Sequence, residues 1–245
     1  MATAGDTPRP SARPPANASA EAGHRQLIAV LQALTVLSGL VDAVCFLGLG
    51  RVFTANMTGN VVVLGFAAAG APGFSVVGGL ISLSVFLVGA GTGGALSRRV
   101  SPRSRLLRLA IWSEVGFVGG AAVVAFLTST AAGTWGRYLV IAILAFAMGI
   151  RNSVIRRLGV PDLSTTVLTS ILTNLAADSF LAGGSNVRAW QRAGSAVAML
   201  AGAIIGAVLY LHQGVGVPLA VMAGSSALIV IALSYSQAGQ YLDRP

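Results

Sequence analysis

The residues best suited to chemistry lie in one otherwise apolar stretch, residues 39–65. Asp42 places a carboxyl group within the first long apolar segment, and Asn56 and Asn60 follow at a spacing that puts both on one face of a helix. Lipid offers such groups no hydrogen-bond partners, so they must face protein, water or a solute. The stretch therefore predicts a binding site whose residues are Asp42, Asn56, Thr58, Gly59 and Asn60.

Asp42 admits two interpretations. A carboxylate at the centre of a membrane helix costs roughly 2.5–3.5 kcal/mol on insertion scales, so it should be protonated, paired or in contact with water. It would then serve as a proton- or cation-coupling group. Alternatively, the helix ends at Gly48 or Gly50, and Asp42 is an acid near the interface that pairs with Arg51 or Arg151.

The polar residues at 56–60 also admit two interpretations. Gly59 would free backbone groups that can bind a solute, and the N-terminus of a half-helix favours an anion. Alternatively, the asparagine and threonine side chains hydrogen-bond between helices and only stabilise their packing. The spacing alone does not decide between a site and a packing contact.

A weaker copy of this pattern occupies residues 149–175. The apolar segment at 163–182 carries threonine, serine and asparagine at four-residue spacing, which gives a helix with one polar stripe. Such a helix belongs in a bundle interior or against a water-filled cavity. The candidate site residues of the second half are Asn152, Thr169 and Asn174.

The two halves align when one is shifted by 110 to 111 residues. The aligned pairs include Gly39 with Gly149, Asp42 with Asn152, Thr58 with Thr169, Ser84 with Ser195, and Gly91 with Gly202. All four apolar segments of each half fall in register. The alignment predicts an internal repeat whose halves are residues 27–128 and 137–236.

Composition indicates the class of protein. Hydrophobic residues make up 55% of the chain and charged residues 9%, with a mean hydropathy of +0.80, whereas soluble domains carry about 25% charged residues. At roughly 20 residues per span, we predict an all-α, polytopic membrane helix bundle with six to eight apolar segments. These lie at about 27–48, 54–71, 75–97, 107–128, 137–155, 163–182, 190–212 and 215–236.

The ends of the chain are polar and set the predicted domain boundaries. Residues 1–25 are rich in Pro, Ala, Ser and charge, so they are predicted to be a disordered tail. The membrane domain is predicted at 26–237, followed by a polar C-terminal tail at 238–245.

The arginines predict how the chain crosses the membrane. The net charge of +9 comes from arginine alone, because the chain has no lysine. If segments 54–71 and 163–182 are short or re-entrant, six helices cross, both termini are cytoplasmic, and the clusters at 98–108 and 151–157 lie inside. The halves are then inverted, as in inverted-repeat transporters. If all eight segments cross, Arg188 and Arg192 fall on the wrong side.

Several other classes of function are not predicted. Cys45 is the single cysteine, and His24 and His212 lie at a tail and a helix end, so no disulfide, metal or cofactor site is expected. No Ser/His/Asp set and no phosphate loop is present, which argues against an enzyme. The arginines cluster in short loops as topology determinants do, so no nucleic-acid partner is expected.

Two further features have structural explanations. Glu114 follows the arginine-rich loop at 98–108 and is predicted to form an interfacial salt bridge. The glycine run at 89–94, together with Gly202 and Gly206, permits close helix contact. These glycine-rich faces could pack within the chain or pair copies of it in a homo-oligomer.

The segment 49–60, Leu-Gly-Arg-Val-Phe-Thr-Ala-Asn-Met-Thr-Gly-Asn, resembles the bacterial YoaK family, an uncharacterised family of small polytopic membrane proteins. The strings beginning at Gly39 (Gly-Leu-Val-Asp-Ala), Gly149 (Gly-Ile-Arg-Asn), Arg156 (Arg-Arg-Leu-Gly) and Thr165 (Thr-Thr-Val-Leu-Thr) carry the same likeness. Ser170 departs from it, since the first half has a glycine at that point. The resemblance covers roughly residues 27–236 and implies location and architecture, with no established substrate.

Two functional hypotheses follow. The first is a small-solute transporter or channel-like permease, multi-pass in the bacterial inner membrane, with a small solute or ion bound between the first, second, fifth and sixth segments. The second is a non-transporting membrane scaffold or accessory subunit whose polar residues only pack helices. In both, the partner of the outer surface is the lipid bilayer.

Overall fold

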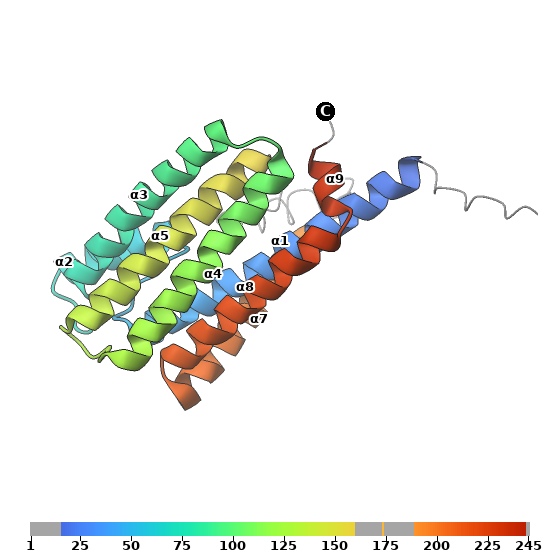
Figure 1. Ribbon diagram of the computed structural model, residues 1–245. Helices are drawn as coiled ribbons and strands as arrows, with labels where there is room; N and C mark the ends of the chain where they lie inside the picture. The colour runs from blue at the N-terminus through green and yellow to red at the C-terminus, as the bar shows by residue number, and fades with distance from the viewer. Residues whose placement is uncertain (1–15, 160–172, 174–188, 244–245) are drawn as a thin grey trace, which may run out of the picture.

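The computed structural model describes residues 16–159, 173 and 189–243 (Figure 1). Its helices are α1 Ala16–Gly48, α2 Met57–Ala68, α3 Val76–Arg99, α4 Arg103–Leu127, α5 Trp135–Leu158, α7 Ala189–Gln213, α8 Gly216–Tyr235 and α9 Ala238–Leu242. Within these residues, six helices are long and apolar enough to cross a membrane, namely α1, α3, α4, α5, α7 and α8. The predicted all-α polytopic bundle is confirmed.

The second apolar segment is short. Its helix α2 has 12 residues, whereas crossing a hydrocarbon core of about 30 Å takes roughly 20. This length favours the model in which segment 54–71 does not span the membrane. Its predicted counterpart at 163–182 lies outside the described residues, apart from Thr173.

Both ends of the chain are more ordered than their composition suggests. Helix α1 begins at Ala16, within the predicted tail at 1–25, and α9 occupies Ala238–Leu242, where a polar tail is predicted. The two ends hold one another: the His24 and Tyr241 rings lie 5.2 Å apart, and the Gln237 backbone N–H donates to Gln26 Oε1 at 2.8 Å. Such tertiary partners cannot be read from the composition of either end.

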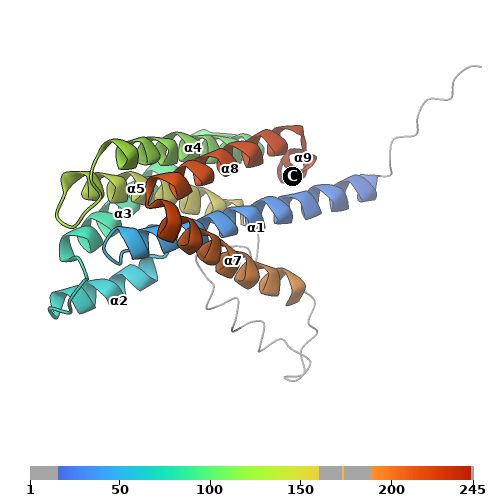
Figure 2. The same ribbon diagram turned by 90° about the horizontal axis from the view of Figure 1, so that it is seen from below.

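The long helices pack in the order α3, α5, α4, α8, α1 and α7, with α2 against α3 (Figures 1 and 2). This order is unchanged when it is read backwards and each helix is replaced by the one that the sequence alignment pairs with it: α1 for α5, α3 for α7 and α4 for α8. The closest packing partners are also related in this way, because α1 lies mainly on α7 and α3 lies mainly on α5.

Glycines bring α1 and α7 into backbone contact. A Cβ atom added at Gly202 would lie 1.9 Å from the Val36 carbonyl oxygen, and one at Gly206 would lie 2.5 Å from the Leu40 carbonyl oxygen. From the other side, a Cβ atom at Gly39 would lie 2.2 Å from a carbonyl oxygen of α7. Small residues permit this approach, which gives van der Waals packing that membrane helices rely on.

Helices α3 and α5 meet in the same manner. A Cβ atom at Gly89 would lie 2.3 Å from the Phe146 carbonyl oxygen, and one at Gly93 would lie 2.7 Å from that of Ile150. Gly91, which the sequence alignment pairs with Gly202, makes no such contact, since a Cβ atom there would meet nothing within 4 Å. The α3 glycines that match the spacing of Gly202 and Gly206 are Gly89 and Gly93.

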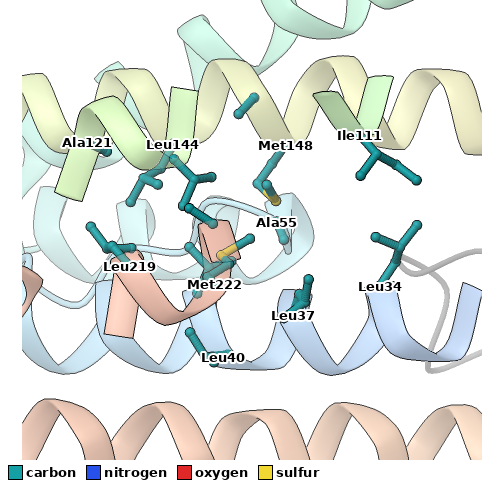
Figure 3. Packing of buried hydrophobic residues seen from close by; sticks show 14 of the residues in the cluster. Leu34, Leu37, Leu40, Ala55, Ile111, Ala121, Leu144, Met148, Leu219 and Met222 are labelled. Atoms are coloured by element: carbon teal, nitrogen blue, oxygen red, sulfur yellow. The ribbon is translucent and has the colours of Figure 1, made fainter. Parts of the chain in front are cut away.

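The hydrophobic core lies between two sets of helices, one formed by α3, α5 and α4 and the other by α8, α1 and α7. Figure 3 shows side chains of α1, α5 and α8 directed at one another, with Ala55, from the segment between α1 and α2, among them. Leu144, Met148 and Met222 are fully buried there. A non-helical segment therefore enters the centre of the bundle, and its backbone polar groups require partners inside it.

Candidate functional site

Helix α1 ends where two residues adopt left-handed backbone conformations. Gly50 has φ +93° and Arg51 has φ +58°, a region that is uncommon for residues with a side chain. The Arg51 guanidinium lies over the Phe74 ring, 4.9 Å from its centroid. The Leu49 carbonyl accepts a hydrogen bond of 2.8 Å from Arg137 Nε. These contacts hold the end of α1 in place.

Beyond this point the chain turns back along α1 as an irregular segment, residues 51–56, and Asp42 hydrogen-bonds to the backbone of this returning segment. The backbone N–H groups of Thr54 and Ala55 both donate to Asp42 Oδ1, at 2.9 and 2.8 Å. Asp42 is 4% exposed, and its other oxygen, Oδ2, is buried and has no hydrogen-bond partner among the described residues. The carboxyl group thus caps backbone N–H groups that the helix break leaves without helical partners inside the bundle.

Asn60, in the first turn of α2, hydrogen-bonds to Phe53, the residue that precedes Thr54 in the returning segment. Its Oδ1 accepts from the Phe53 N–H at 2.7 Å, and its Nδ2 donates to the Phe53 carbonyl at 2.6 Å. Ser82 of α3 donates to the same carbonyl at 2.6 Å and accepts from Asn60 Nδ2 at 2.9 Å. One asparagine therefore replaces, for Phe53, the hydrogen bonds that a regular helix would supply.

Asn152 of α5 completes this arrangement. Its Nδ2 donates to the Ala55 carbonyl at 3.4 Å, while the N–H of Ala55 donates to Asp42. Asp42 and Asn152, which the alignment pairs, therefore bind the backbone N–H and the backbone carbonyl of the same residue, Ala55. We call Asp42, Asn60, Ser82 and Asn152 the break cluster.

A pocket of about 260 Å³ lies where the break meets α3 and α5. Its lining comprises Ala55, Asn56, Met57, Thr58, Phe86, Ala90, Asn152, Ser153 and Arg156. Asn56 precedes α2 without forming a side-chain cap, and the first N–H groups of a helix have no partners within the helix. The pocket is thus lined by polar side chains, by Arg156 and by residues at the start of α2.

A second, more apolar pocket of about 420 Å³ lies on the other side of the break, between α1 and α7. Asp42 and Asn56 are the polar side chains in its lining, and Phe46, Phe53 and Ile204 are among the apolar ones. The break therefore separates two pockets, and Asn56 borders both.

Four more buried side chains form what we call the ion-pair cluster: Ser38 of α1, Glu114 of α4, Arg151 of α5 and Ser226 of α8. Arg151 Nη1 lies 2.9 Å from Glu114 Oε1, with both side chains 0% exposed. Arg151 Nη2 donates to Ser38, and Ser226 donates to Glu114 Oε1 at 3.2 Å. Within the part of the chain that the structure describes, Glu114 Oε2 and Arg151 Nε have no hydrogen-bond partner.

The two clusters adjoin. Ser38 lies one helical turn before Asp42 on α1, and Arg151 immediately precedes Asn152 on α5. The charge of Arg151 acts on both Asp42 and Glu114. Two carboxyl groups and one guanidinium thus share the centre of the bundle.

The structure brings most of the predicted first-half residues together, in two different roles. Asp42 and Asn60 hydrogen-bond to the backbone of the break, whereas Asn56 and Thr58 line the 260 Å³ pocket. Gly59 gives room to the Phe53 ring, which a Cβ atom there would approach to 2.9 Å. Thr169 and Asn174 lie outside the described residues.

The structure differs from the expected ion pairs of both acids. Asp42 accepts hydrogen bonds from backbone amides and does not pair with Arg51, whose guanidinium lies over Phe74 outside the core. Of the two partners considered for Asp42, Arg151 is the one whose charge acts on it. Glu114 forms no interfacial salt bridge with the arginine-rich loop, because it points into the bundle toward Arg151. Arg151 accordingly is no part of a cytoplasmic arginine cluster.

Sequence reasoning missed Ser82 and Arg156, and it named Arg151 as a possible partner of Asp42 but not of Glu114. Ser82 resembles any small residue of a packed helix, and its role depends on the fold of a segment 29 residues earlier. For Arg151 a signal existed, since it precedes the end of α5 by two helical turns and its pattern of apolar neighbours continues to Leu158. An arginine at that depth needs a buried acid, and Glu114 is a second acid within an apolar segment.

Comparison with known proteins places the chain in a family. The family model described as "Protein of unknown function (DUF1275)" matches residues 30–233. The chain belongs to the DUF1275 family. The UPF0700 transmembrane protein YoaK of Bacillus subtilis (strain 168) is 31% identical to this DUF1275 protein over 153 residues, which span 61% of this chain and 65% of that protein. No solved structure matches. The resemblance to the YoaK family is confirmed.

Proposed function

We propose that this DUF1275 protein is a small-solute transporter or channel-like permease of the bacterial inner membrane. The supporting observation is the helix break, which enters a bundle of six candidate spans beside a 260 Å³ pocket with a partly polar lining. Irregular backbone at membrane depth is tolerated where protein buries it or where it lines a water-filled cavity. Broken helices of this kind form the binding sites of many transporters.

The solute would lie against Asn56, Thr58 and Asn152, which are the pocket-lining members of the predicted site. Gly59 and Asn60 would act indirectly, by shaping the first turn of α2. For the second half, Thr169 and Asn174 remain candidate residues of the same site. The proposal needs no cofactor and no chemical step, so the protein would not be an enzyme.

An inverted internal repeat is part of the proposal. Its support is the palindromic packing order of the long helices and the matched glycine contacts, in which Gly202 and Gly206 approach α1 as Gly89 and Gly93 approach α5. Three spans per half would place the two halves in opposite orientations. Alternating access could then arise from movement of α3, α5 and α4 against α8, α1 and α7, two groups that meet mainly between α4 and α8.

The proposed orientation puts both termini in the cytoplasm. The start of α4 is held to α9 through Ser104 and Asp243, so the loop at 100–102 lies at the same end as both termini. Arg98, Arg99, Arg103, Arg105 and Arg108 surround that loop, and positive residues favour the cytoplasm. Arg156 of the pocket lies toward this end of α5, so the pocket would face inward.

A scaffold or accessory subunit is the second candidate, and one observation favours it. Asn60 uses its side-chain oxygen and nitrogen on Phe53 and Ser82, and so leaves little capacity for a solute. In this view the break only shapes the bundle. The glycine faces give little support to a homo-oligomer, because Gly89, Gly93, Gly202 and Gly206 contact helices of the same chain.

Accessibility of the pocket to water distinguishes the two functions. In a Cys45→Ala background, Thr58→Cys in the pocket should react with a charged, membrane-impermeant thiol reagent in inverted membrane vesicles. Val62→Cys, on the exposed outer face of α2, should not react because lipid covers it. If Thr58→Cys is as unreactive as Val62→Cys while Ser101→Cys in the loop is labelled, the pocket is dry and the transporter proposal fails.

The same background tests the orientation. Ala132→Cys lies in the exposed loop between α4 and α5, and Ser101→Cys lies in the exposed loop between α3 and α4. We expect Ala132→Cys to be labelled in intact cells and Ser101→Cys only in inverted vesicles. The opposite pattern would reverse the proposed orientation.

A further inference from the structure

The buried charges at the centre of the bundle do not balance. Asp42, Glu114 and Arg151 lie together at 4%, 0% and 0% exposure, which sets two carboxyl groups against one guanidinium. Arg137 is also buried, but it lies at the start of α5, about 20 Å from Arg151 at 1.5 Å per residue, and binds the Leu49 carbonyl. In the part of the chain that the structure describes, one carboxyl group therefore lacks a counter-charge.

The hydrogen bonds indicate which carboxyl group that is. Glu114 contacts Arg151 directly, at 2.9 Å, and also accepts from Ser226, so it is the natural partner of the guanidinium. Asp42 accepts from two neutral amides on Oδ1 and has the neutral amide of Asn56 nearby, and no described residue hydrogen-bonds to its Oδ2. A buried carboxylate without a partner is far more costly than a neutral carboxylic acid in the same place.

The described residues around Asp42 supply no alternative counter-ion. On α1 its nearest titratable neighbour is Cys45, whose thiol lies 3.5 Å from Thr54 Oγ1. On α5 the charged residue that acts on Asp42 is Arg151, which already forms an ion pair with Glu114 of α4. On α7 the residues that share its pocket are Met199, Ala203, Ile204 and Ala207, all apolar. A sodium ion would need several oxygen ligands, and the described groups lining this pocket do not provide them.

We propose that Asp42 is a proton-binding site, which takes a proton from solvent on Oδ2 and so neutralises the centre of the bundle. Proton binding by itself does not depend on transport. Its use as the coupling ion rests on the proposed function. The site would then accept one proton for the pair of carboxyl groups, with Arg151 compensating the charge of Glu114.

The geometry connects this proton to the solute pocket. Hydrogen bonds to a charged carboxylate are shorter and stronger than those to a neutral one, so loss of the proton tightens the hold of Asp42 on Thr54 and Ala55. Ala55 lines the 260 Å³ pocket, and its carbonyl accepts from Asn152, which lines the same pocket. Protonation of Asp42 would therefore alter the position of residues 54–55, next to which the solute binds.

Infrared difference spectroscopy tests the site directly. The full-length protein in nanodiscs, without added solute, would be recorded in H₂O and D₂O across a pH titration. We expect the carbonyl stretch of a protonated carboxylic acid near neutral pH in the wild-type protein, shifted in D₂O and lost at high pH. Asp42→Asn should abolish this band, and the exposed-site control Asp243→Asn should leave it unchanged.

Glu114→Gln tests the charge balance. It leaves Arg151 free to neutralise Asp42, so the band at neutral pH should weaken strongly. The proposal is overturned if the wild-type protein shows no protonated carboxyl band, if the band persists in Asp42→Asn, or if Glu114→Gln leaves it unchanged. A band that sodium chloride abolishes, when potassium chloride does not, would show that sodium occupies the site instead.

The wild-type spectrum alone shows whether a protonated carboxyl band is present. The proposal can therefore still be overturned if Asp42→Asn does not fold. Failure of the transporter proposal would look different. Then Thr58→Cys would be inaccessible to the thiol reagent although the carboxyl band and its loss in Asp42→Asn were both present.

Discussion

The break cluster and the ion-pair cluster lie side by side in the bundle but answer different needs. In the break cluster, Asp42, Asn60 and Asn152 bind backbone groups of residues 53–55, which a chain leaving a helix inside a membrane must satisfy. In the ion-pair cluster, Glu114 and Arg151 bind one another and two serines. No backbone group there requires a charge.

This contrast shows which polar residues the fold itself explains. Once the chain breaks at Gly50, the neutral hydrogen bonds of Asn60 and Ser82 are a structural necessity. A buried ion pair is not, because well-packed apolar residues of similar volume are often as stable. An ionisable group at position 42 is likewise unnecessary for capping, since an asparagine could accept the same two amide hydrogen bonds. The ionisable groups that the fold does not explain are therefore the best candidates for function.

Removal of one member of the ion pair should have the greatest effect on stability. Arg151→Met leaves Glu114 buried without its partner, and we expect a loss of about 4 kcal/mol in the free energy of unfolding. The measurement is reversible unfolding in mixed micelles, followed by tryptophan fluorescence. The double variant Glu114→Met/Arg151→Met should recover most of the loss. A single variant within about 1 kcal/mol of wild type would show that the pair is not buried as described.

The glycine contacts give the next largest effect. Gly202→Ala forces a Cβ atom to within 1.9 Å of the Val36 carbonyl oxygen, and overpacking of this kind should cost about 3 kcal/mol. Gly89→Ala, at the matching contact of α3, should cost a similar amount in the same unfolding assay. Gly91→Ala faces open space and is the control. Equal effects at Gly89 and Gly91 would contradict the register of α3 on α5.

Within the break cluster, Asn60→Ala should cost about 2 kcal/mol, because it leaves the partly buried Phe53 N–H without its acceptor. Ser82 still satisfies the Phe53 carbonyl, which limits the loss. Asn56→Ala is the matched control, since Asn56 forms no side-chain cap. If the two variants unfold at the same denaturant concentration, Asn60 does not hold the break.

The smallest effect is expected at the edge of the ion-pair cluster. Ser226→Ala removes a hydrogen bond of 3.2 Å to Glu114 Oε1, while the contact of that oxygen with Arg151 remains. A loss of about 1 kcal/mol follows from the usual net value of such a bond. A loss as large as that of Arg151→Met would mean that Ser226, rather than the guanidinium, holds the carboxylate in place.

Much of the fold could be predicted because lipid imposes simple rules. Apolar segments of sufficient length gave the six long helices, and the short segment with two asparagines gave α2 and the break before it. The polar stretch at 54–60 could be located for the same reason, since lipid tolerates no such cluster. The partners of each side chain could not be predicted, because Ser82 and Glu114 reach the centre only through the packing of distant helices.

The register of the proposed repeat shows the same limit. Gly39 and Gly149 could be aligned from sequence because a shared pattern surrounds them. In α3, Gly89, Gly91 and Gly93 are equally plausible by spacing, and only the approach of the α5 carbonyls distinguishes them. The roles of Asp42 and Asn152 at Ala55 likewise required the path of the chain through the bundle.

Solute flux through the 260 Å³ pocket is the most direct test of the account. Proteoliposomes containing wild-type protein would be exposed, in a stopped-flow light-scattering assay, to gradients of small neutral, anionic and cationic solutes. We predict that at least one class enters faster than into protein-free liposomes, and that Thr58→Trp, which fills the pocket, abolishes this flux without lowering stability. Flux that never exceeds the protein-free rate, or that Thr58→Trp leaves unchanged, would contradict the account.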